Sequence, residues 1–78
     1  MWIVYIIECS DAKLYTGITN DINRRLEEHN SGSGSKFTRA RKPVKLAYSE
    51  IVRTRSAALK REASIKKLSR KEKLDLIK

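Results

Sequence analysis

The stretch YTGITNDINRRLEEH, residues 15–29, runs from an extended segment straight into a helix, and this junction decides the fold. The helix places Ile22 and Leu26 on one buried stripe, and Arg25 and His29 fall on the same stripe. A cation and an imidazole on a buried face cost free energy unless they find partners. This face is therefore expected to look onto a site, and the arginine is suited to an anion.

Two strands precede this helix and are expected to form a β-hairpin. Residues 2–9, WIVYIIEC, are a nearly unbroken β-branched and aromatic run, which is typical of a central strand covered on both faces. After a short polar turn, residues 13–19, KLYTGIT, form the second strand. Tyr15 and Gly17 share one face of this strand. A glycine weakens a strand unless a backbone, side chain or ligand approaches closely there.

The rest of the chain alternates between helix and strand signals. Capping residues predict where the helices begin, and the Gly/Ser-rich segment SGSGSKFTRARKP predicts a flexible loop. The expected elements are a helix from Asp21 to Asn30, a loop to Pro43, a strand over 44–52 with Leu46 and Tyr48 on the same face, a helix from Thr54 or Ser56 to Leu68, and a last helix started by the capping box at Ser69. The pattern predicts an α+β protein in the order β-β-α-β-α-α.

Length and cysteine content limit the class of protein. The 78 residues suit one domain, 1–78, with a modest core and no room for a second module. The single Cys9 excludes an intramolecular disulfide framework or a multi-cysteine zinc site, and it is expected to be a small buried strand residue. The apolar opening is too short to span a bilayer and does not resemble a secretory signal. We therefore expect a cytoplasmic protein without a membrane anchor.

The positive charge is confined to one part of the chain. The net charge is +9, but residues 1–35 hold three Lys or Arg against five Asp or Glu, which gives −2, whereas residues 36–78 hold fifteen against four, which gives +11. Such an uneven basic charge is the expected footprint for a polyanion, with nucleic acid favoured over an anionic membrane surface. A merely soluble basic surface is the alternative.

The basic half opens with a cationic loop around one aromatic residue. Such a loop can grip a phosphate backbone and stack on a base, although a solvated surface connection is an equally good interpretation of any single member. Its candidate nucleic-acid-binding residues are Lys36, Phe37, Arg39, Arg41 and Lys42.

A second out-of-pattern residue, Glu62, lies between Ala58 and Ile65 in helical angle, at a position the apolar pattern reserves for the core. Together with Arg25 it suggests phosphodiester hydrolysis, which needs an activated water and a positive partner for the phosphate. Arg25 can clamp the phosphate, Glu62 can hold one Mg²⁺ or Mn²⁺, and a tyrosine or His29 can handle the proton. A purely structural Arg25–Glu62 ion pair is the alternative.

These residues resemble the GIY-YIG nuclease superfamily, and within it the small stand-alone YhbQ-like members. The matching elements are Ile3-Val4-Tyr5 for the first motif, Tyr15-Thr16-Gly17 for the second, Arg25 and His29 on the next helix, and Glu62 on a later helix. The similarity extends over essentially the whole chain. Ile3 replaces the glycine of the first motif, a departure that spares the tyrosine.

The resemblance implies a small three-stranded antiparallel sheet flanked by three helices and metal-dependent hydrolysis of one DNA strand at a time. On this analogy Tyr5 is the general base, Tyr15 supports it or the phosphate, Arg25 steadies the phosphate, and Glu62 carries the single divalent ion. His29 could accept a proton, orient Tyr5 or bind phosphate. Gly17 would let the site approach the scissile backbone. Because a phenol has a pKa near ~10 in water, Tyr5 would need nearby cations to lower it.

Three functions therefore follow from the sequence. The first is a DNA endonuclease, structure-selective or weakly selective, that serves repair or recombination as a monomer or weak dimer, with a possible protein partner for targeting. The second is a non-catalytic DNA- or RNA-binding module that uses the same basic surface. The third is a basic adaptor for an acidic protein partner. Without an attached DNA-binding domain, binding is expected to follow phosphate number or DNA shape rather than base sequence.

Overall fold

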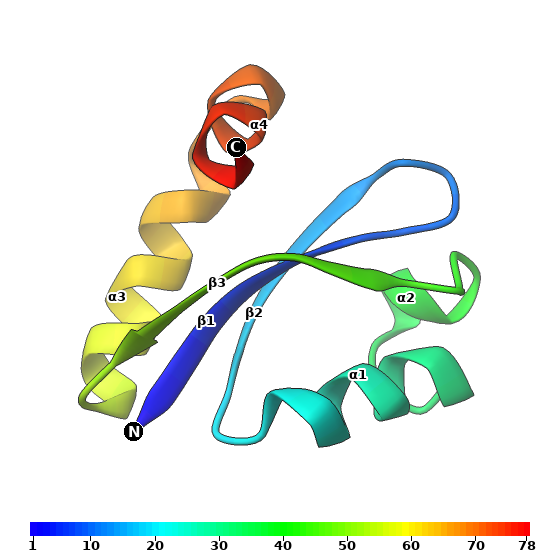
Figure 1. The fold of residues 1–78 in the computed structure, drawn as a ribbon, viewed down its shortest axis with the longest axis horizontal. Coiled ribbons are helices and arrows are strands. Elements are labelled where there is room, and N and C mark those ends of the chain that lie inside the picture. Colours follow the sequence, from blue (N-terminus) through cyan, green and yellow to red (C-terminus); the bar gives the residue numbers. More distant parts are fainter.

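Three antiparallel strands form a sheet with helices on both faces in a computed structural model that describes residues 1–78 (Figure 1). The strands are β1 (Trp2–Glu8), β2 (Leu14–Thr19) and β3 (Lys45–Val52), and the helices are α1 (Ile22–Ser31), α2 (Lys36–Arg39), α3 (Arg55–Lys66) and α4 (Arg70–Ile77). The strand order β2-β1-β3 places β1 in the centre, as its apolar run predicts. The α+β class and the hairpin are confirmed.

The two faces of β1 carry separate halves of the core. Val4 and Ile6 pack with Ala58 and Ile65 of α3 on one face, whereas Tyr5 and its neighbours on the other face pack against α1 and α2. Alternate residues of a strand point to opposite faces, so neighbouring positions of β1 serve different layers. Only 13 of the 78 residues are buried, so each of these contacts is a large share of a small core.

The ends of α1 follow the predicted capping chemistry. The Asp21 side chain accepts a hydrogen bond from the backbone N–H of Arg24 at 3.1 Å, and Gly32 closes the helix in the left-handed region with φ of 89°. The last helix begins with the predicted capping box between Ser69 and Glu72. The caps at Asp21 and Gly32 fix the ends of α1, the helix that carries Arg25 and His29.

The segment predicted as a flexible loop contains a helix, so the molecule has four helices and not three. Ser35 and Thr38 form a reciprocal capping box around the single turn of α2. Arg41 then ties this turn to the β1–β2 turn, because its guanidinium bonds Asp11 at 3.1 Å and the Phe37 carbonyl at 2.9 Å. The many Gly and Ser residues of this segment suggest a loop. However, Ser35 and Thr38 have the three-residue spacing of a capping box, which marks the start of a helix.

Strand β3 departs from simple alternation. Tyr48 pairs with Ile6 and Leu46 pairs with Ile7, so one extra residue, Ala47, forms a bulge between them. Residues that pair directly share a face, and Ile6 and Ile7 point to opposite faces. The prediction that Leu46 and Tyr48 share a face is therefore wrong.

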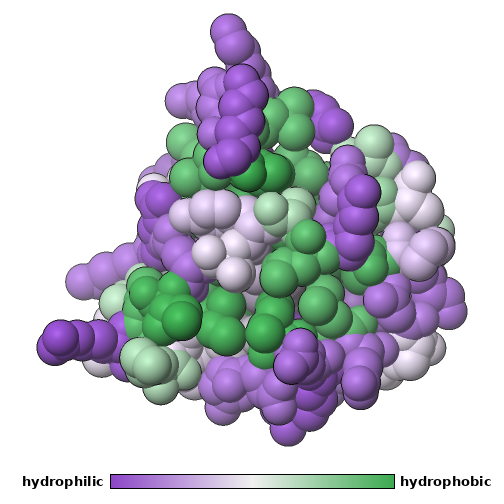
Figure 2. All heavy atoms as spheres, viewed as in Figure 1, coloured by the Kyte–Doolittle hydropathy of each residue, from purple (hydrophilic) through white to green (hydrophobic).

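None of the four helices has the length and apolar character needed to cross a membrane. Figure 2 shows apolar side chains over the middle of the face that β3 presents, with hydrophilic side chains around them. The exposed large apolar residues include Leu46 and Ile51 of β3 and Leu74 of α4.

Candidate active site

Tyr5 is the centre of a polar cluster on the α1 side of the sheet. Its side chain is 1% exposed, and its hydroxyl lies against Gly17, the directly paired residue of β2. A β-carbon at Gly17 would stand 2.5 Å from Tyr5 Oη and 2.7 Å from Cζ, closer than real β-carbons approach. The close approach expected at Gly17 is thus made by the phenol of Tyr5. Because Gly17 has no side chain, the Tyr5 hydroxyl can lie directly against strand β2.

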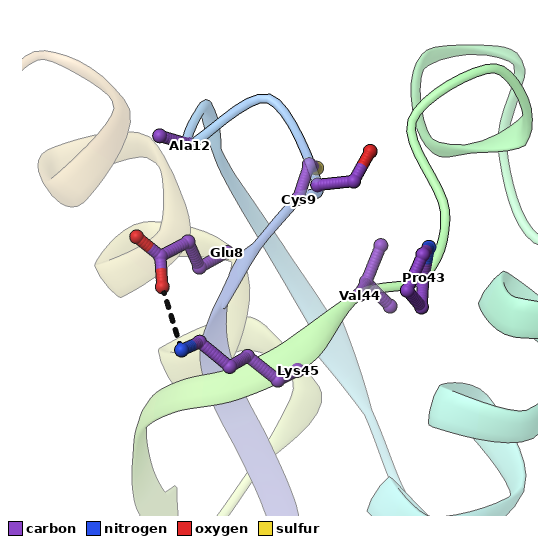
Figure 3. A pocket seen from close by; sticks show the side chains of 7 residues that line it. Glu8, Cys9, Ala12, Pro43, Val44 and Lys45 are labelled. Carbon is purple, nitrogen blue, oxygen red and sulfur yellow. Dashed lines mark ion pairs between the residues drawn. The ribbon is translucent and has the colours of Figure 1, made fainter.

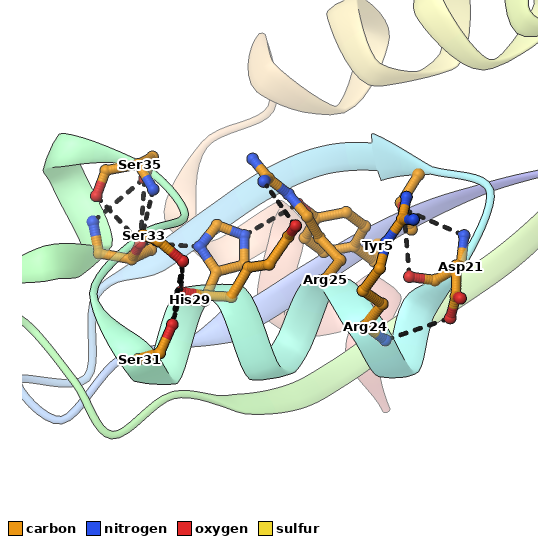
Figure 4. Close-up of polar contacts among 11 residues, drawn as sticks. Tyr5, Asp21, Arg24, Arg25, His29, Ser31, Ser33 and Ser35 are labelled. Atoms are coloured by element: carbon orange, nitrogen blue, oxygen red, sulfur yellow. Dashed lines mark hydrogen bonds and ion pairs between the residues drawn. The ribbon is translucent and has the colours of Figure 1, made fainter.

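His29 projects from α1 onto Tyr5 and is completely buried (Figure 4). Its Nε2 lies 3.1 Å from Tyr5 Oη, and its Nδ1 lies 2.7 Å from Thr38 Oγ1. The Thr38 hydroxyl donates to the Ser35 carbonyl at 3.3 Å. With both ring nitrogens engaged and no exposed surface, His29 orients Tyr5 and can exchange a proton with it, but it does not face solvent as a phosphate ligand.

Arg25 completes the cluster and fixes the direction of its hydrogen bonds. Its Nε donates to Tyr5 Oη at 3.4 Å, and its Nη1 donates to Glu28 at 3.1 Å. Because Tyr5 accepts from Arg25, its own proton is free to go to His29 Nε2, which leaves the imidazole hydrogen on Nδ1. The network then runs in one direction, from Tyr5 through His29 and Thr38 to the Ser35 carbonyl.

Burial governs the proton affinities in this cluster. It raises the pKa of the Tyr5 phenol, and the hydrogen bond and charge of Arg25 only partly offset this rise. Burial, with help from the Arg25 charge, lowers the pKa of His29. The cation that the sequence required beside Tyr5 is present, yet it does not lower the phenol's pKa below its ordinary value. The resting site therefore holds a protonated Tyr5 and a neutral His29.

Glu62 approaches the same tyrosine from the opposite layer of the fold. The carboxylate is close enough that its charge contributes to raising the pKa of Tyr5. Its side chain is 19% exposed and pairs with Lys66, one helical turn further on, at 3.3 Å. The structural alternative, an Arg25–Glu62 ion pair, is not formed, because Arg25 pairs with Glu28. Both ionisable residues are therefore held near Tyr5 without neutralising each other.

Tyr15 links the polar cluster to α2 through its ring. The ring centroids of Tyr15 and His29 lie 5.4 Å apart, and those of Tyr15 and Phe37 lie 5.7 Å apart in a stacked arrangement. The guanidinium of Arg41 lies 4.2 Å from the Phe37 ring centroid. Phe37 and Arg41, both predicted to contact nucleic acid, are thus engaged with the protein itself.

The other predicted nucleic-acid-binding cations differ from Arg41. Lys36 and Arg39 are exposed on α2, Lys42 follows it, and none of the three forms an ion pair. Lys36 and Arg39 lie on the short helix whose Thr38 holds His29. These three cations therefore remain available to phosphate beside the polar cluster.

The sequence interpretation missed the residues that support His29. Thr38 is completely buried and bonds the imidazole, and a β-carbon at Gly34 would collide with the His29 ring. The Ser-x-x-Thr spacing at 35–38 is the signal that could have predicted this support. A helix of four residues is too short to show a helical period in its sequence.

The largest cavity of the molecule lies away from this cluster. It measures about 340 Å³ and is lined by Glu8, Cys9, Ser10, Ala12, Pro43, Val44 and Lys45 (Figure 3). None of the predicted site residues lines it. Glu8 and Lys45, which both line it, form an ion pair at 3.2 Å, and burial raises the pKa of the Cys9 thiol. A protonated thiol is a poor nucleophile, so the predicted structural role of Cys9 fits its position.

A tyrosine pair on a hairpin, an inward arginine and histidine on the next helix, and a glutamate on a later helix define a class of nuclease domain. The family described as the GIY-YIG catalytic domain matches residues 1–75. The chain belongs to this family, which is a nuclease superfamily and implies nucleic acid as the ligand.

Within this class, the chain belongs with the UPF0213 proteins. It is 62% identical over 76 residues to a UPF0213 protein of Syntrophus aciditrophicus, a match that covers 96% of this chain and 87% of that protein. It is 55% identical over 75 residues to a UPF0213 protein of Staphylococcus aureus, covering 96% and 92%. The resemblance to small members of the superfamily is therefore confirmed.

Two solved structures share the fold. A solution NMR structure of a UPF0213 protein from Bacillus halodurans matches with a TM-score of 0.63 and 41% identity, covering 99% of this chain and 83% of that one. A solution NMR structure of a protein from E. faecalis matches with a TM-score of 0.62 and 48% identity, covering 91% and 76%. The expected three-stranded α+β fold is thus shared with these two structures.

Nucleases of this superfamily generally use divalent metal ions, and the chain offers a minimal oxygen site for one. No group of three His, Cys, Asp or Glu side chains is close enough to form a protein-only metal cage. Glu62 supplies one largely buried carboxylate, near enough for its charge to act on Tyr5. Mg²⁺ is often held by one or two carboxylates, its own waters and substrate phosphate, so this donor set fits an ion that binds together with its substrate.

Proposed function

We propose that this protein is a divalent-metal-dependent endonuclease that hydrolyses a phosphodiester bond in one strand of DNA. The observation that carries the proposal is the hydrogen-bonded network Arg25–Tyr5–His29, with the Glu62 carboxylate near enough for its charge to act on Tyr5. We further propose that the enzyme is structure-selective or weakly selective and serves DNA repair or recombination.

The network suits a proton relay around Tyr5. As an attacking water forms its bond to phosphorus, Tyr5 Oη takes the water's proton while its own proton passes to His29 Nε2. The phosphorus–oxygen bond opposite the water then breaks, and the leaving oxygen takes up a proton from solvent. A simultaneous transfer avoids a free phenolate, which the raised pKa of Tyr5 disfavours. His29 is ready for this role because its lowered pKa keeps it neutral.

Arg25 and Glu62 act on the phosphate from two sides. Arg25 uses Nε on Tyr5 and Nη1 on Glu28, so its remaining N–H groups can contact a phosphate oxygen beside the phenol. Glu62 would hold one Mg²⁺ or Mn²⁺, which when bound supplies positive charge to the developing phosphorane. Glu62 has to release Lys66 to do so, a small cost for a half-exposed pair.

A nicking assay tests this function. The protein is incubated with Mg²⁺ or Mn²⁺ and single-stranded, duplex, flapped and branched DNA, beside Glu62→Gln and Arg25→Ala proteins purified identically. We expect cleavage by the parent that each variant reduces at least ~100-fold, because each loses charge stabilisation of the transition state. Equal cleavage by parent and variants would assign the activity to a contaminant or a different site.

A non-catalytic nucleic-acid-binding module is the second candidate. It is favoured by the single carboxylate at the site, which is paired with Lys66 at 3.3 Å. In that case binding would be steeply salt-dependent, with no metal-dependent product from any DNA structure. The binding and nicking assays together separate the two functions.

A further inference from the structure

A second cleft lies beyond the tyrosines, where three elements that are distant in sequence meet. It measures about 200 Å³ and is lined by Lys13 and Leu14 from the β1–β2 turn and the start of β2, Phe37 from α2, and Arg70 and Lys73 from α4. In Figure 1 the β1–β2 turn extends between α4, above it, and α2, below it. The cleft therefore has cationic walls and an apolar, partly aromatic base.

The positive charge of this cleft is not neutralised by the protein. Neither Lys13 nor Lys73 forms an ion pair, and the carboxylates nearby in sequence have other partners: Asp11 pairs with Arg41, Glu8 with Lys45, and Asp75 with Lys78. Glu72 is bound to the backbone N–H of Ser69 as part of the helix cap. Unpaired cations around a concave apolar surface indicate an anionic ligand with an apolar part.

Arg70 has a structural part in the cleft. Its guanidinium donates to the Ala12 carbonyl at 3.0 Å, which fixes α4 against the β1–β2 turn. Lys13 and Lys73 are consequently held on facing elements, with their ammonium groups free.

The cleft is a short distance from the polar cluster around Tyr5. Phe37 lines it, and its ring stacks on Tyr15 at 5.7 Å, while the Tyr15 ring lies 5.4 Å from that of His29. Phe37 and Tyr15 therefore connect the cleft to the polar cluster, and a strand bound at the cluster can continue into the cleft.

We propose that this cleft binds the unpaired strand that continues from the cleaved phosphate, with Lys13 and Lys73 on its phosphates and Leu14 and the exposed edge of Phe37 against a base or sugar. The inference rests on the proposed function, because it takes the cluster around Tyr5 as the point of cleavage. Cationic grooves with apolar or aromatic floors are the usual way to hold single strands, whose bases are free to leave the stack. Blunt duplex DNA keeps its bases stacked and can offer the cleft phosphates only.

The inference gives a physical origin for structure selectivity. A flap or frayed end places unpaired nucleotides a few steps from the cut, where the cleft can hold them, whereas a continuous duplex does not. Discrimination between these substrates then comes from Lys13, Leu14 and Lys73 and not from base-sequence readout.

The test compares two variants that lose the same charge. Lys13→Gln/Lys73→Gln removes the free cations of the cleft, and Lys67→Gln/Lys71→Gln removes two exposed cations that form no ion pair and do not line it. Binding of fluorescent single strands of about four and about twelve nucleotides, a blunt duplex and a flap is measured in EDTA, which prevents cleavage. Each titration is repeated between about 50 and 200 mM salt.

We expect the cleft variant to bind the longer single strand and the flap roughly tenfold more weakly, with a salt slope smaller by about 1.4, or about 0.7 for each lost phosphate contact. The shorter strand should weaken in the same direction, because it can also occupy the cleft, whereas the blunt duplex should change by no more than it does in the control variant. Equal losses in the two variants, an equal loss on the duplex, or a parent protein that does not bind single strands would each overturn the inference.

Nicking with Mg²⁺ by the parent is recorded separately, so the two proposals can fail independently. A selective loss of single-strand binding without any nicking would keep the cleft and remove the nuclease function. Normal nicking with identical behaviour of the two variants would keep the nuclease and remove the cleft.

Discussion

His29 is the only histidine of the chain, and its imidazole lies completely buried between Tyr5 and Thr38. Burial lowers its pKa in the folded state, whereas an unfolded chain leaves it near the ordinary value of about 6.5. Below that pH, His29 of the unfolded chain binds a proton, whereas the buried imidazole of the folded protein stays neutral. The stabilising effect of a neutral His29 is therefore complete above about pH 6.5 and is lost as the pH falls towards the folded-state pKa.

We predict that the free energy of unfolding falls as the pH is lowered from about 6.5 to about 5.5, by up to about 1.4 kcal/mol for each unit by which the pKa is lowered. Urea titrations at several pH values measure it, and an NMR titration of the imidazole gives the folded-state pKa directly. A His29→Gln protein is the control, because it should be less stable but flat across this window. A parent protein that is equally flat would contradict the buried neutral imidazole.

Gly17 is the residue on which the position of the Tyr5 hydroxyl depends. Gly17→Ala should destabilise the protein by about 1–3 kcal/mol, because its β-carbon would overlap Tyr5 Oη and Cζ and the strand pair has little freedom to move. Nicking should be lost, since Tyr5 must leave His29. Chemical denaturation measures the stability. Tyr5→Phe removes the nearest overlapping atom, so the double variant should cost less than the sum of the two single changes, and strict additivity would be evidence against this contact.

The sequence identifies single residues of the site better than it identifies their partners. Arg25 and His29 stand out because they interrupt an apolar stripe, and Glu62 stands out in the same way. Their partners depend on side-chain geometry that periodicity does not describe. Arg25 pairs with Glu28, and Glu62 pairs with Lys66, in each case one turn away on the same helix. An ion pair between Arg25 and Glu62 is therefore not formed. Such local competition is decided by a few tenths of a kcal/mol.

At the level of elements, the one-turn helix α2 is the support of the polar cluster. Its capping box fixes Thr38, and Thr38 is the second partner of His29. Arg41 anchors the helix to the β1–β2 turn through Asp11. The Gly/Ser-rich segment before it lets the chain fold closely over the imidazole, where a β-carbon at Gly34 would collide.

We predict that Thr38→Val lowers stability by about 1–3 kcal/mol, because it has nearly the same shape but leaves the Nδ1 hydrogen of His29 buried without an acceptor. Nicking should fall with it, since the imidazole loses its preferred tautomer. Thr38→Ser keeps the hydroxyl and is the matched control, so it should retain activity at a modest cost in stability. Denaturant titrations and single-turnover nicking measure both effects. If Val and Ser behaved alike, the hydroxyl would have no part in the site.

Strands and long helices are predictable because their periodic patterns extend over many residues, whereas short features are not. The ends of α1 and the start of α4 follow from their caps, and β1 is central because its sequence is apolar on both faces. The bulge at Ala47 is invisible to a period-two pattern, since one inserted residue leaves the composition unchanged. Helix α2 is similarly hidden by the glycines and serines around it.

Over the whole molecule, charge and catalytic chemistry are divided between the two parts of the chain. Residues 1–35 carry a net −2 and supply Tyr5, Tyr15, Arg25 and His29, whereas residues 36–78 carry a net +11. The fold brings cations of the second part, on α2 and α4, beside the tyrosines of the first. This arrangement attracts a polyanion towards the cluster while its buried core remains free of excess charge.

The exposed cations on α2 and just after it, Lys36, Arg39 and Lys42, should therefore serve binding and not the chemical step. We predict that Lys36→Gln/Arg39→Gln/Lys42→Gln lowers the salt slope of single-strand binding by about 2, or about 0.7 for each contact, and raises the concentration of DNA needed for half-maximal nicking. The rate at saturating DNA should stay unchanged, because none of these residues contacts Tyr5 or His29 in the described network.

The matched control removes three unpaired cations elsewhere, Arg53→Gln/Lys60→Gln/Lys67→Gln, and brings the net charge from +9 to +6 in the same way. If attraction depends on total charge alone, the two triple variants will lose equal affinity, since each changes the long-range field by the same amount. If the strand lies along α2, the first variant will lose much more, because phosphate contacts are short-range and add to that field. We expect the second outcome, and a fall in the saturated nicking rate of the α2 variant would instead mean that these cations act on the reaction itself.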